Sequence, residues 1–409
     1  MKPLILVQTG AKNVLRQVGR TSAALTAVVF GVVSMILAAG FIDWNLEFGR
    51  DHSIESQLGH LQVMRPGFLE LGRSDPHAYL LPARAATDLA DLHALPGYRV
   101  DAPRLLISGL ASSGDITLSF IGEGVDPAAE AILSASLRFP EGRNLLPDEP
   151  NTVIVGSGLA ENLQTGLGDL LVLIANTEAG GISAVEARVV GIFESIFKAY
   201  DDVALRIPLA LSRELMRSEG EHLRLVLLER IDQTEAAVEQ LRGSLPADHY
   251  QVVPWQDMSD FYNKSVELFS KQVGVIYLII GVIIVLAISN TMTMAVMERV
   301  GEIGTLMALG NRRRDILGIF LAEGCILGLL GAGVGLVLGI LLGLLISAIG
   351  IPMPPGPVMA WGYEAGILLS VENLGKAAII ALVTTVLASI YPAWKASRLA
   401  IVDALRTRQ

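Results

Sequence analysis

The chain has 409 residues, of which 52% are apolar and only 18% charged, and its mean hydropathy is +0.51. Soluble proteins carry about 25% charged residues, so these values exclude a disordered chain or a disulfide scaffold and indicate a membrane protein with a large soluble part. The net charge of −10 disfavours nucleic acid as a partner, and the single cysteine, Cys325, can form neither an intrachain disulfide nor a cysteine metal cluster.

The first apolar segment, residues 21–42, follows a basic lead-in, residues 1–20, and holds no charge between Arg20 and Asp43. A helix needs about 20 apolar residues to cross about 30 Å of hydrocarbon, and this segment is long enough. Its long lead-in argues against a cleaved secretion signal, and no cysteine follows it as in a lipoprotein signal. We therefore predict an uncleaved first membrane helix over 21–42.

Residues 43–272 form a long acidic segment that mixes predicted strands and helices. Residues 43–58 are expected to continue the first helix as a polar stalk. The predicted strands are His60–Met64, Arg104–Gly109, Ile116–Ile121, Thr152–Val155, Leu170–Ile174, Ala187–Ile192, Val203–Ile207, Leu223–Leu228 and Tyr250–Val253. The predicted helices are Ala83–His93, Leu159–Leu163, Pro208–Met216 and Glu235–Leu245. This alternation predicts an α+β domain with a mostly β insertion at about 124–204.

No catalytic or metal site is expected in this segment, and the chain is not expected to be an enzyme. Its histidines have no metal-binding spacing, so we interpret them as solvated surface or turn residues: His52, His60, His77, His93, His222 and His249. Ser157 is flanked directly by Gly156 and Gly158, whereas a nucleophile elbow needs GxSxG spacing, so a turn is predicted. Trp255 and Tyr262 are interpreted as interfacial anchors, with binding of an apolar cargo as the alternative.

Three further apolar segments, 273–297, 316–349 and 376–394, are linked by residues 298–315 and 350–375 and followed by a tail, 395–409. Lys and Arg concentrate in 1–20, 298–315 and 395–409 and are absent from 350–375. By the positive-inside rule, both termini are expected to be cytoplasmic. The predicted fold is a membrane protein of four transmembrane α-helices with a large α+β periplasmic domain between helices 1 and 2.

The link 298–315 is the segment with the clearest functional pattern. Ile303, Leu306, Met307 and Leu309 would give a short helix an apolar side, and Gly310-Asn311 would end it. From the residues alone, this helix is either a docking surface for another protein or a solvated interhelical loop.

This segment resembles the signature of the FtsX/MacB/LolC-LolE superfamily of ABC-transporter permeases, a pattern of the form ER-x-x-EIG-x-L-x-ALG. The residues that fit it are Glu298, Arg299, Glu302, Ile303, Gly304, Leu306, Ala308, Leu309 and Gly310. The resemblance continues through Phe320–Gly324 and Tyr391–Leu399, although Ile401 stands where the family usually has proline. Gly124–Pro127 and Gly168-Asp169 are similar to segments of the family's periplasmic core domain.

The resemblance implies a multi-pass inner-membrane permease that couples ATP hydrolysis to movement of its periplasmic domain, with 298–315 as the cytoplasmic coupling helix. Since the sequence has no GxxxxGK[ST] loop, ATP and Mg²⁺ are expected in a separate cytoplasmic ABC ATPase subunit, and no cofactor in this chain. A second permease copy or a paralogue is the other expected partner.

The expected cargo is a lipoprotein or another amphipathic molecule taken from the inner membrane. The alternatives are MacB-like efflux through a periplasmic adaptor and an FtsX-like regulator of an envelope hydrolase that transports nothing. The size of the segment 43–272 favours transport over a bare regulator.

The segment 316–349 has two features of its own. Gly331, Gly335, Gly339 and Gly343 recur every four residues, and such a stripe lets helices approach closely in lipid. The stripe is expected either at a homodimer face or against helix 1 or 2 of the same chain. Glu323 is interpreted as an interfacial, snorkelling carboxylate with a role in packing, and a proton relay is the alternative.

Overall fold

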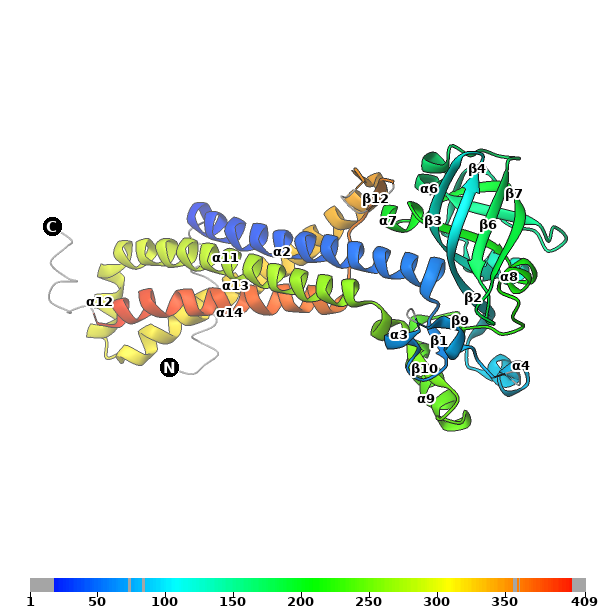
Figure 1. Cartoon of the computed structure of the whole chain (residues 1–409). Coiled ribbons are helices and arrows are strands. Elements are labelled where there is room, and N and C mark those ends of the chain that lie inside the picture. The colour runs from blue at the N-terminus through cyan, green and yellow to red at the C-terminus, as the bar shows by residue number, and fades with distance from the viewer. Residues whose placement is uncertain (1–17, 73–74, 83–84, 356–358, 360, 399–409) are drawn as a thin grey trace. The chain divides into compact units, whose positions relative to one another are not determined.

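The computed structural model describes residues 18–72, 75–82, 85–355, 359 and 361–398, which form two compact units (Figure 1). The membrane unit contains the described residues up to Leu46, Ser265–Pro352 and those from Glu364 onward. The sheet unit contains Glu47–Lys264 and Met353–Tyr363. Most of the basic lead-in, and the end of the family-like tail with Leu399 and Ile401, lie outside the described residues.

Among the described residues, four helices are long and apolar enough to cross a membrane, which confirms the predicted four-helix architecture. They are α2 (Val18–Ser53), α11 (Asp260–Glu298), α13 (Arg313–Ile349) and α14 (Val371–Ser397). Each extends beyond its predicted apolar segment because the backbone hydrogen-bond ladder does not depend on hydropathy, so a helix can continue through polar residues. At the start of α14, for example, the Ser370 side chain accepts a hydrogen bond from the backbone N–H of Asn373 at 3.2 Å.

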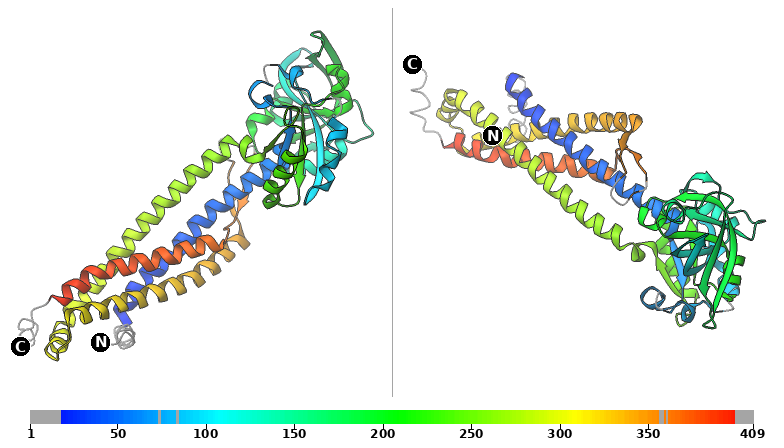
Figure 2. Two further views of the ribbon diagram at one scale, coloured as in Figure 1. Left: turned by 90° about the horizontal axis from the view of Figure 1, so that it is seen from below. Right: turned by 45° about the horizontal axis from the view of Figure 1, so that its top comes forward.

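The long helices of the membrane unit lie side by side (Figure 2). They share one buried core to which all four contribute, including Val28 and Val32 of α2, Ile288 of α11 and Phe320 of α13. Helices α13 and α14 approach closely at Gly324, where a Cβ atom would lie 2.0 Å from Ser389 Oγ. Small residues therefore set the helix spacing, as expected in lipid, where burial of apolar surface does not drive association.

In its described part, the sheet unit is built on one ten-stranded sheet (Figure 1). Its strands are β1 (Leu61–Met64), β2 (Tyr98–Ser113), β3 (Ile116–Val125), β4 (Arg138–Gly142), β5 (Thr152–Gly156), β6 (Leu170–Asn176), β7 (Ile182–Glu194), β8 (Ala204–Pro208), β9 (Leu223–Leu228) and β10 (Gln251–Pro254). The helices around it are α3 (Phe68–Leu71), α4 (Ala85–Asp88), α5 (Pro127–Leu133), α6 (Ser157–Leu163), α7 (Lys198–Asp201), α8 (Leu209–Met216), α9 (Thr234–Ser244) and α10 (Trp255–Met258). This mixture confirms the predicted α+β class of the domain.

The strand order is β10-β1-β9-β2-β3-β8-β5-β7-β4, and β6 pairs with both β2 and β7. The chain of pairings β2-β3-β8-β5-β7-β6-β2 therefore closes into a ring around a core that includes Leu105, Phe120, Leu173 and Leu205. The predicted β insertion at 124–204 supplies β5, β6 and β7 of this ring, and β2, β3 and β8, which lie almost entirely outside the insertion, complete it. A closed ring leaves fewer strand edges open to other chains.

The predicted helix Ala83–His93 is not one continuous helix among its described residues. The chain forms α4 and then a 3₁₀ segment, η3 (Ala90–Ala94). Leu89, Leu92 and Leu95 are all at least 96% buried, and their spacing of three residues matches the three residues per turn of a 3₁₀ helix. Burial of this leucine row against the core therefore decides the local geometry.

Two of the histidines interpreted as solvated are buried, so that interpretation was wrong for His60 and His222. His60 Nδ1 accepts the backbone N–H of Leu228, and His222 Nδ1 accepts that of Leu106, each at 3.0 Å. Burial lowers the pKa of both rings to about 4, so both are neutral near pH 7. They are structural hydrogen-bond acceptors within the sheet unit.

The other residues singled out for chemistry also have structural positions. Trp255 is 4% exposed and packs 5.2 Å from the Tyr262 ring, so the interpretation of Trp255 as an interfacial anchor was wrong. Ser157 begins α6 directly after β5. Gly158 beside it lies so close to α7 that a Cβ atom would be 2.0 Å from Asp202 Oδ1. Among the described residues, no group of three or more His, Cys, Asp or Glu is arranged to hold a metal ion.

The segment between α13 and α14 contributes part of the sheet unit. It carries the short paired strands β11 (Ile351–Met353) and β12 (Tyr363–Ala365). The Tyr363 ring stacks on Phe48 with centroids 4.5 Å apart, and the Arg138 guanidinium lies 3.6 Å from the Trp361 ring centroid. Aromatic and cation–π contacts therefore hold this segment against the stalk and β4.

Candidate transmission site

The residues between α11 and α13 form a short helix, α12 (Val300–Ala308), preceded by Arg299 at its N-cap. At its other end Gly310 has φ = +92°, a conformation that favours glycine. The backbone N–H and the side-chain amide of Asn311 both donate to the Leu306 carbonyl, at 3.2 and 3.1 Å. Gly310-Asn311 thus ends the helix at the position expected from the sequence.

One face of α12 is anchored in the membrane unit. Ile303 is 3% exposed, Gly304 is also buried, and Leu306 and Met307 pack against the shared core of the long helices. The apolar side predicted from the sequence therefore faces inward at these positions, and it fixes α12 to the helices that it connects.

The other face of α12 is exposed. Glu298, Glu302, Ala308 and Gly310 are exposed, and Leu309 is 77% exposed. The expectation that Leu309 shares the apolar side of Ile303 was wrong, because Leu309 lies at the C-cap, where the backbone leaves the helix. The result is a surface with two carboxylates at one end and an exposed leucine at the other.

Arg299 forms a buried ion pair with Glu323 of α13. Arg299 Nη1 lies 3.7 Å from Glu323 Oε2, and the two residues are 8% and 4% exposed. The interpretation of Glu323 as a snorkelling interfacial carboxylate was therefore wrong, because its charge is directed inward to a buried partner. A lone acidic residue within an otherwise uncharged membrane segment is a signal for a buried partner, which the interpretation as a snorkelling carboxylate overlooked, and sequence spacing does not identify Arg299 as that partner.

The glycine stripe of α13 packs against α2 within this chain. A Cβ atom at Gly331, Gly335 or Gly339 would lie 2.6–2.7 Å from Val28, Val32 or Ile36 respectively. At Gly343 the nearest neighbour is Leu369, which precedes α14. Of the two arrangements that the sequence left open, the structure shows the intrachain one.

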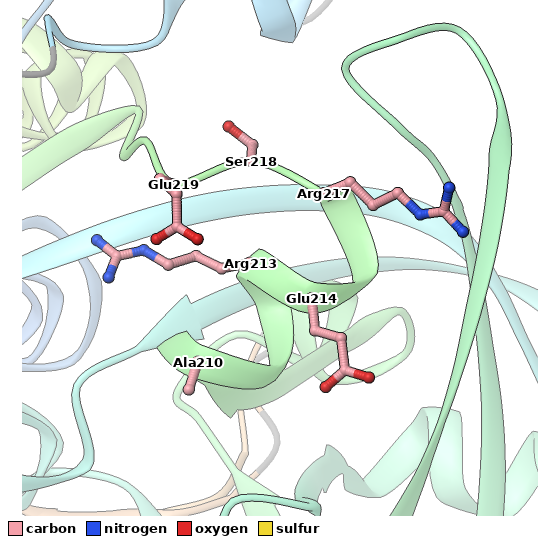
Figure 3. Close-up of a pocket in the computed structure, with 6 residues that line it drawn as sticks. All are labelled: Ala210, Arg213, Glu214, Arg217, Ser218 and Glu219. Atoms are coloured by element: carbon pink, nitrogen blue, oxygen red, sulfur yellow. The ribbon is translucent and has the colours of Figure 1, made fainter.

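A surface cavity of about 540 Å³ lies beside α8 in the sheet unit (Figure 3). It is lined by Ala210, Arg213, Glu214, Arg217, Ser218 and Glu219. Figure 3 shows the Arg213 side chain directed toward Glu219 and the Arg217 side chain directed away on the opposite side. Because its basic groups do not converge and acidic groups neighbour them, the cavity does not resemble a built ligand site.

Residues 21–244, more than half of the chain, match the MacB-like periplasmic core domain, and residues 274–401 match the FtsX-like permease C-terminal family. The chain belongs to this MacB/FtsX-like permease family. The second match contains the whole of α12, so the outward and inward faces described above lie in the permease domain of this family member.

Several curated proteins are similar to this permease. An ABC transporter permease of Methanocaldococcus jannaschii is 29% identical over 65% of this chain and 65% of its own length. The macrolide export ATP-binding/permease protein MacB of Bdellovibrio bacteriovorus is 24% identical over 95% of this chain and 59% of its own length. The lipoprotein-releasing system transmembrane protein LolC of Xylella fastidiosa is 23% identical over 69% of this chain and 72% of its own length. The chain therefore spans about three fifths to two thirds of the first two relatives.

Proposed function

We propose that this permease is the membrane subunit of an ABC transporter, in which a separate cytoplasmic ATPase docks on α12 and drives movement of the sheet unit. The observation that carries the proposal is the two-sided character of α12. Its inner face is held by Ile303 and by the Arg299–Glu323 pair, while its outer face ends in the 77% exposed Leu309. A short helix anchored on one side and open on the other can transmit a displacement from a bound partner.

The proposed orientation places α12 and both termini in the cytoplasm and the sheet unit on the opposite side of the inner membrane. Arg312, Arg313 and Arg314 follow α12 and are exposed, whereas the α13–α14 segment, residues 350–370, has neither Lys nor Arg. This asymmetry supports the orientation by the positive-inside rule. ATP and Mg²⁺ would be bound by the partner ATPase, and the full transporter would contain a second permease copy or a paralogue.

The proposed cargo is a lipoprotein or another amphipathic molecule that leaves the membrane without crossing a polar pore. Three buried polar side chains of the membrane unit have partners within that unit: Thr385 and Ser389 donate back to their own helix, and Asn373 donates to Asp43 at 2.6 Å. An apolar groove of about 400 Å³ between α11 and α14, lined by residues that include Gly281 and Thr384, would accept an acyl chain. The lipoprotein-releasing role named for LolC is consistent with this choice.

Export through an adaptor is the second candidate, because the alignment with the macrolide exporter covers 95% of this chain. The two candidates differ in what accompanies the complex. Lipoproteins would support extraction from the membrane, a periplasmic adaptor would support export, and an envelope hydrolase would support a regulatory role.

The test is affinity purification of the tagged chain from its own membranes in mild detergent, followed by mass spectrometry. We expect an ABC ATPase with the parent chain and its loss from the variant Leu309→Asp, because a charge on the exposed tip of α12 would oppose an apolar contact. Ile182→Asp is the matched control, since Ile182 is 75% exposed but lies on β7 of the sheet unit. Absence of an ATPase from the parent complex would overturn the proposed function.

A further inference from the structure

Four charged side chains form a buried network in the sheet unit. Arg206 of β8 and Glu130 of α5 are 0% exposed and Arg104 of β2 is 2% exposed, while the Glu123 side chain of β3 is 18% exposed. Arg206 Nη1 lies 2.5 Å from Glu130 Oε1, and Arg104 Nη2 lies 2.7 Å from Glu130 Oε2. Glu123 Oε2 lies 3.2 Å from Arg206 Nε and 3.7 Å from Arg104 Nη1. Two cations and two anions therefore balance inside the domain.

The strand register brings these charges together. Glu123 of β3 is aligned with Arg206 in the parallel β3–β8 pair, and Arg104 pairs with Val125, two residues after Glu123 on the same strand. Burial alone would raise the pKa of Glu130, but Arg104 and Arg206 outweigh burial and hold that pKa below its ordinary value. Glu130 is thus ionised, and the fold carries the desolvation cost of burying these charged groups.

A gain in folding stability does not explain why these charges are buried, because buried ion networks can often be replaced by apolar residues with little loss of stability. The geometry provides another reason. The remaining arm of Arg206 leaves the network: its Nη2 donates to the main-chain carbonyl of Ser56 at 2.9 Å. Ser56 lies in η1 (Ile54–Leu58), the π-helical turn in which the stalk of α2 ends.

Arg104 differs from Arg206 in the groups that its guanidinium contacts. It contacts the same two carboxylates, and among the described residues these are its ion-pair partners. Of the four charged residues, only Arg206 has a hydrogen bond to η1 within the described part of the chain. Because η1 ends the stalk, its last carbonyls lack partners within the helix and can accept a hydrogen bond from a side-chain donor. Single π turns are also frequent in functional segments.

We infer that Arg206 is a positioning residue that fixes the end of the α2 stalk to the sheet, so that a displacement of the stalk moves the ring of strands as a rigid body. Glu123, whose Oε2 lies 3.2 Å from Arg206 Nε, is sufficient to hold the Arg206 guanidinium in the orientation that reaches the Ser56 carbonyl, so this orientation does not require Arg104 or Glu130. This inference rests on the proposed function for its role in transport, but the joint itself can be tested without an ATPase.

The experiment uses the full chain with Cys325→Ser and two introduced cysteines, Asp51→Cys on the stalk and Ser119→Cys on β3, both at exposed positions. Spin labels on these cysteines report the stalk-to-sheet distance by pulsed electron paramagnetic resonance. Two matched double variants are compared, Arg206→Met with Glu130→Gln and Arg104→Met with Glu130→Gln. Each removes one cation and one anion, so neither leaves a net charge in the core.

We expect one narrow distance distribution in the parent and in the Arg104 variant, and loss of that single narrow peak in the Arg206 variant. Equal narrowness in both variants, or equal broadening in both, would overturn the inference, since the latter means a structural role shared by the whole network. If a double variant does not fold, Arg206→Lys and Arg104→Lys give the same comparison with charge retained, because lysine lacks the forked donor geometry.

Transport by the complex with its ATPase separates this inference from the proposed function. We expect the Arg206 variant to retain ATP hydrolysis and to lose transport, while the Arg104 variant retains both. If no ATPase binds the parent chain, the proposed function fails, but the distance measurement still decides whether Arg206 fixes the stalk.

Discussion

At the scale of single residues, the sheet unit depends on polar groups whose ionisation state is set by burial. His60 and His222 accept backbone N–H groups as neutral rings, whereas Arg206 and Glu130 remain charged because each has a buried counter-charge. Burial likewise raises the pKa of Asp201 to about 6, although Ser195 donates its backbone N–H to this carboxylate. Because the two histidines and Asp201 change charge between about pH 4 and 6.5, the stability of the sheet unit is expected to depend on pH over this range.

Acidification is expected to destabilise the sheet unit. His60 and His222 have a pKa of about 4 when folded and about 6.5 when unfolded, so their contribution is full above pH 6.5 and is lost as the pH falls toward 4. Asp201 acts in the opposite direction over nearly the same range, because its folded pKa is raised. The destabilising effect of the two histidines exceeds the stabilising effect of Asp201. We therefore expect the free energy of unfolding to fall by about 1 kcal/mol between pH 7.5 and 5.5, after an allowance for solvent screening.

The urea midpoint of a variant in which Trp44, Trp361 and Trp394 are replaced by Phe, followed by the fluorescence of the remaining Trp255 at both pH values, measures this loss of stability. The variant His222→Gln should show a smaller change between the two pH values, because one of the two titrating acceptors is removed. An unchanged midpoint in the single-tryptophan chain would contradict the assignment of these histidines as buried acceptors.

The Arg299–Glu323 pair is expected to behave as a unit in stability measurements. Glu323→Leu removes one charge from a buried pair, which costs roughly 3 kcal/mol, while the double variant Arg299→Met with Glu323→Leu should lie closer to the parent chain. A double-mutant cycle measures this coupling: thermal unfolding in detergent is compared for the parent, Arg299→Met, Glu323→Leu and the double variant. Additive effects would show that the two charges are not coupled.

At the scale of elements, α13 packs closely against α2 because the residues of α13 at this contact are glycines, which have no side chain. Gly331, Gly335 and Gly339 let the backbone of α13 approach Val28, Val32 and Ile36. In the same helix, a Cβ atom at Gly333 would have nothing within 4 Å. The stripe is therefore specific to one face rather than a general property of a glycine-rich helix.

Gly335→Leu is expected to destabilise the membrane unit by about 1–3 kcal/mol, because a large side chain would force α13 away from Val32. Gly333→Leu is the matched control on the same helix and should be close to neutral. Thermal inactivation of the purified chain in detergent compares the two. Equal effects at both positions would mean that α2 does not pack on the stripe.

The sequence anticipated the elements better than their detailed geometry. Apolar length located α2, α11, α13 and α14, and alternation located most strands, because both patterns depend on neighbours along the chain. The 3₁₀ geometry of η3 and the ion pairs of Arg206 and Arg299 depend on residues far apart in sequence, so periodicity could not show them. For the candidate site, the sequence located α12 but placed Leu309 on the wrong face.

At the scale of the whole molecule, two units are joined by continuous chain: α2 and α11 each contribute residues to both. The proposed function requires displacement of α12 to reach the sheet unit through such helices. Transport of a lipidated cargo would also require the membrane unit to receive an acyl chain at its lipid-facing surface.

Filling the groove between α11 and α14 should reduce transport of lipidated cargo. Gly281→Trp places a large ring near Thr384 in this groove, whereas Ile283→Trp adds the same ring at a 56% exposed position outside the groove lining. Release of a lipidated substrate from proteoliposomes that contain the permease and its ATPase measures the difference. Equal activity of the two variants would argue against the groove as the acyl site.

The sequence by itself determined the four membrane helices, the α+β class of the domain and the position and ends of α12, since hydropathy, periodicity and turn residues act locally. Only the tertiary structure decided which face of α12 is exposed, that the glycine stripe packs on α2, and that Arg206 reaches the stalk. Those features arise when strands and helices distant in sequence meet and bury charge or backbone together, and no pattern along the chain encodes which partners will meet.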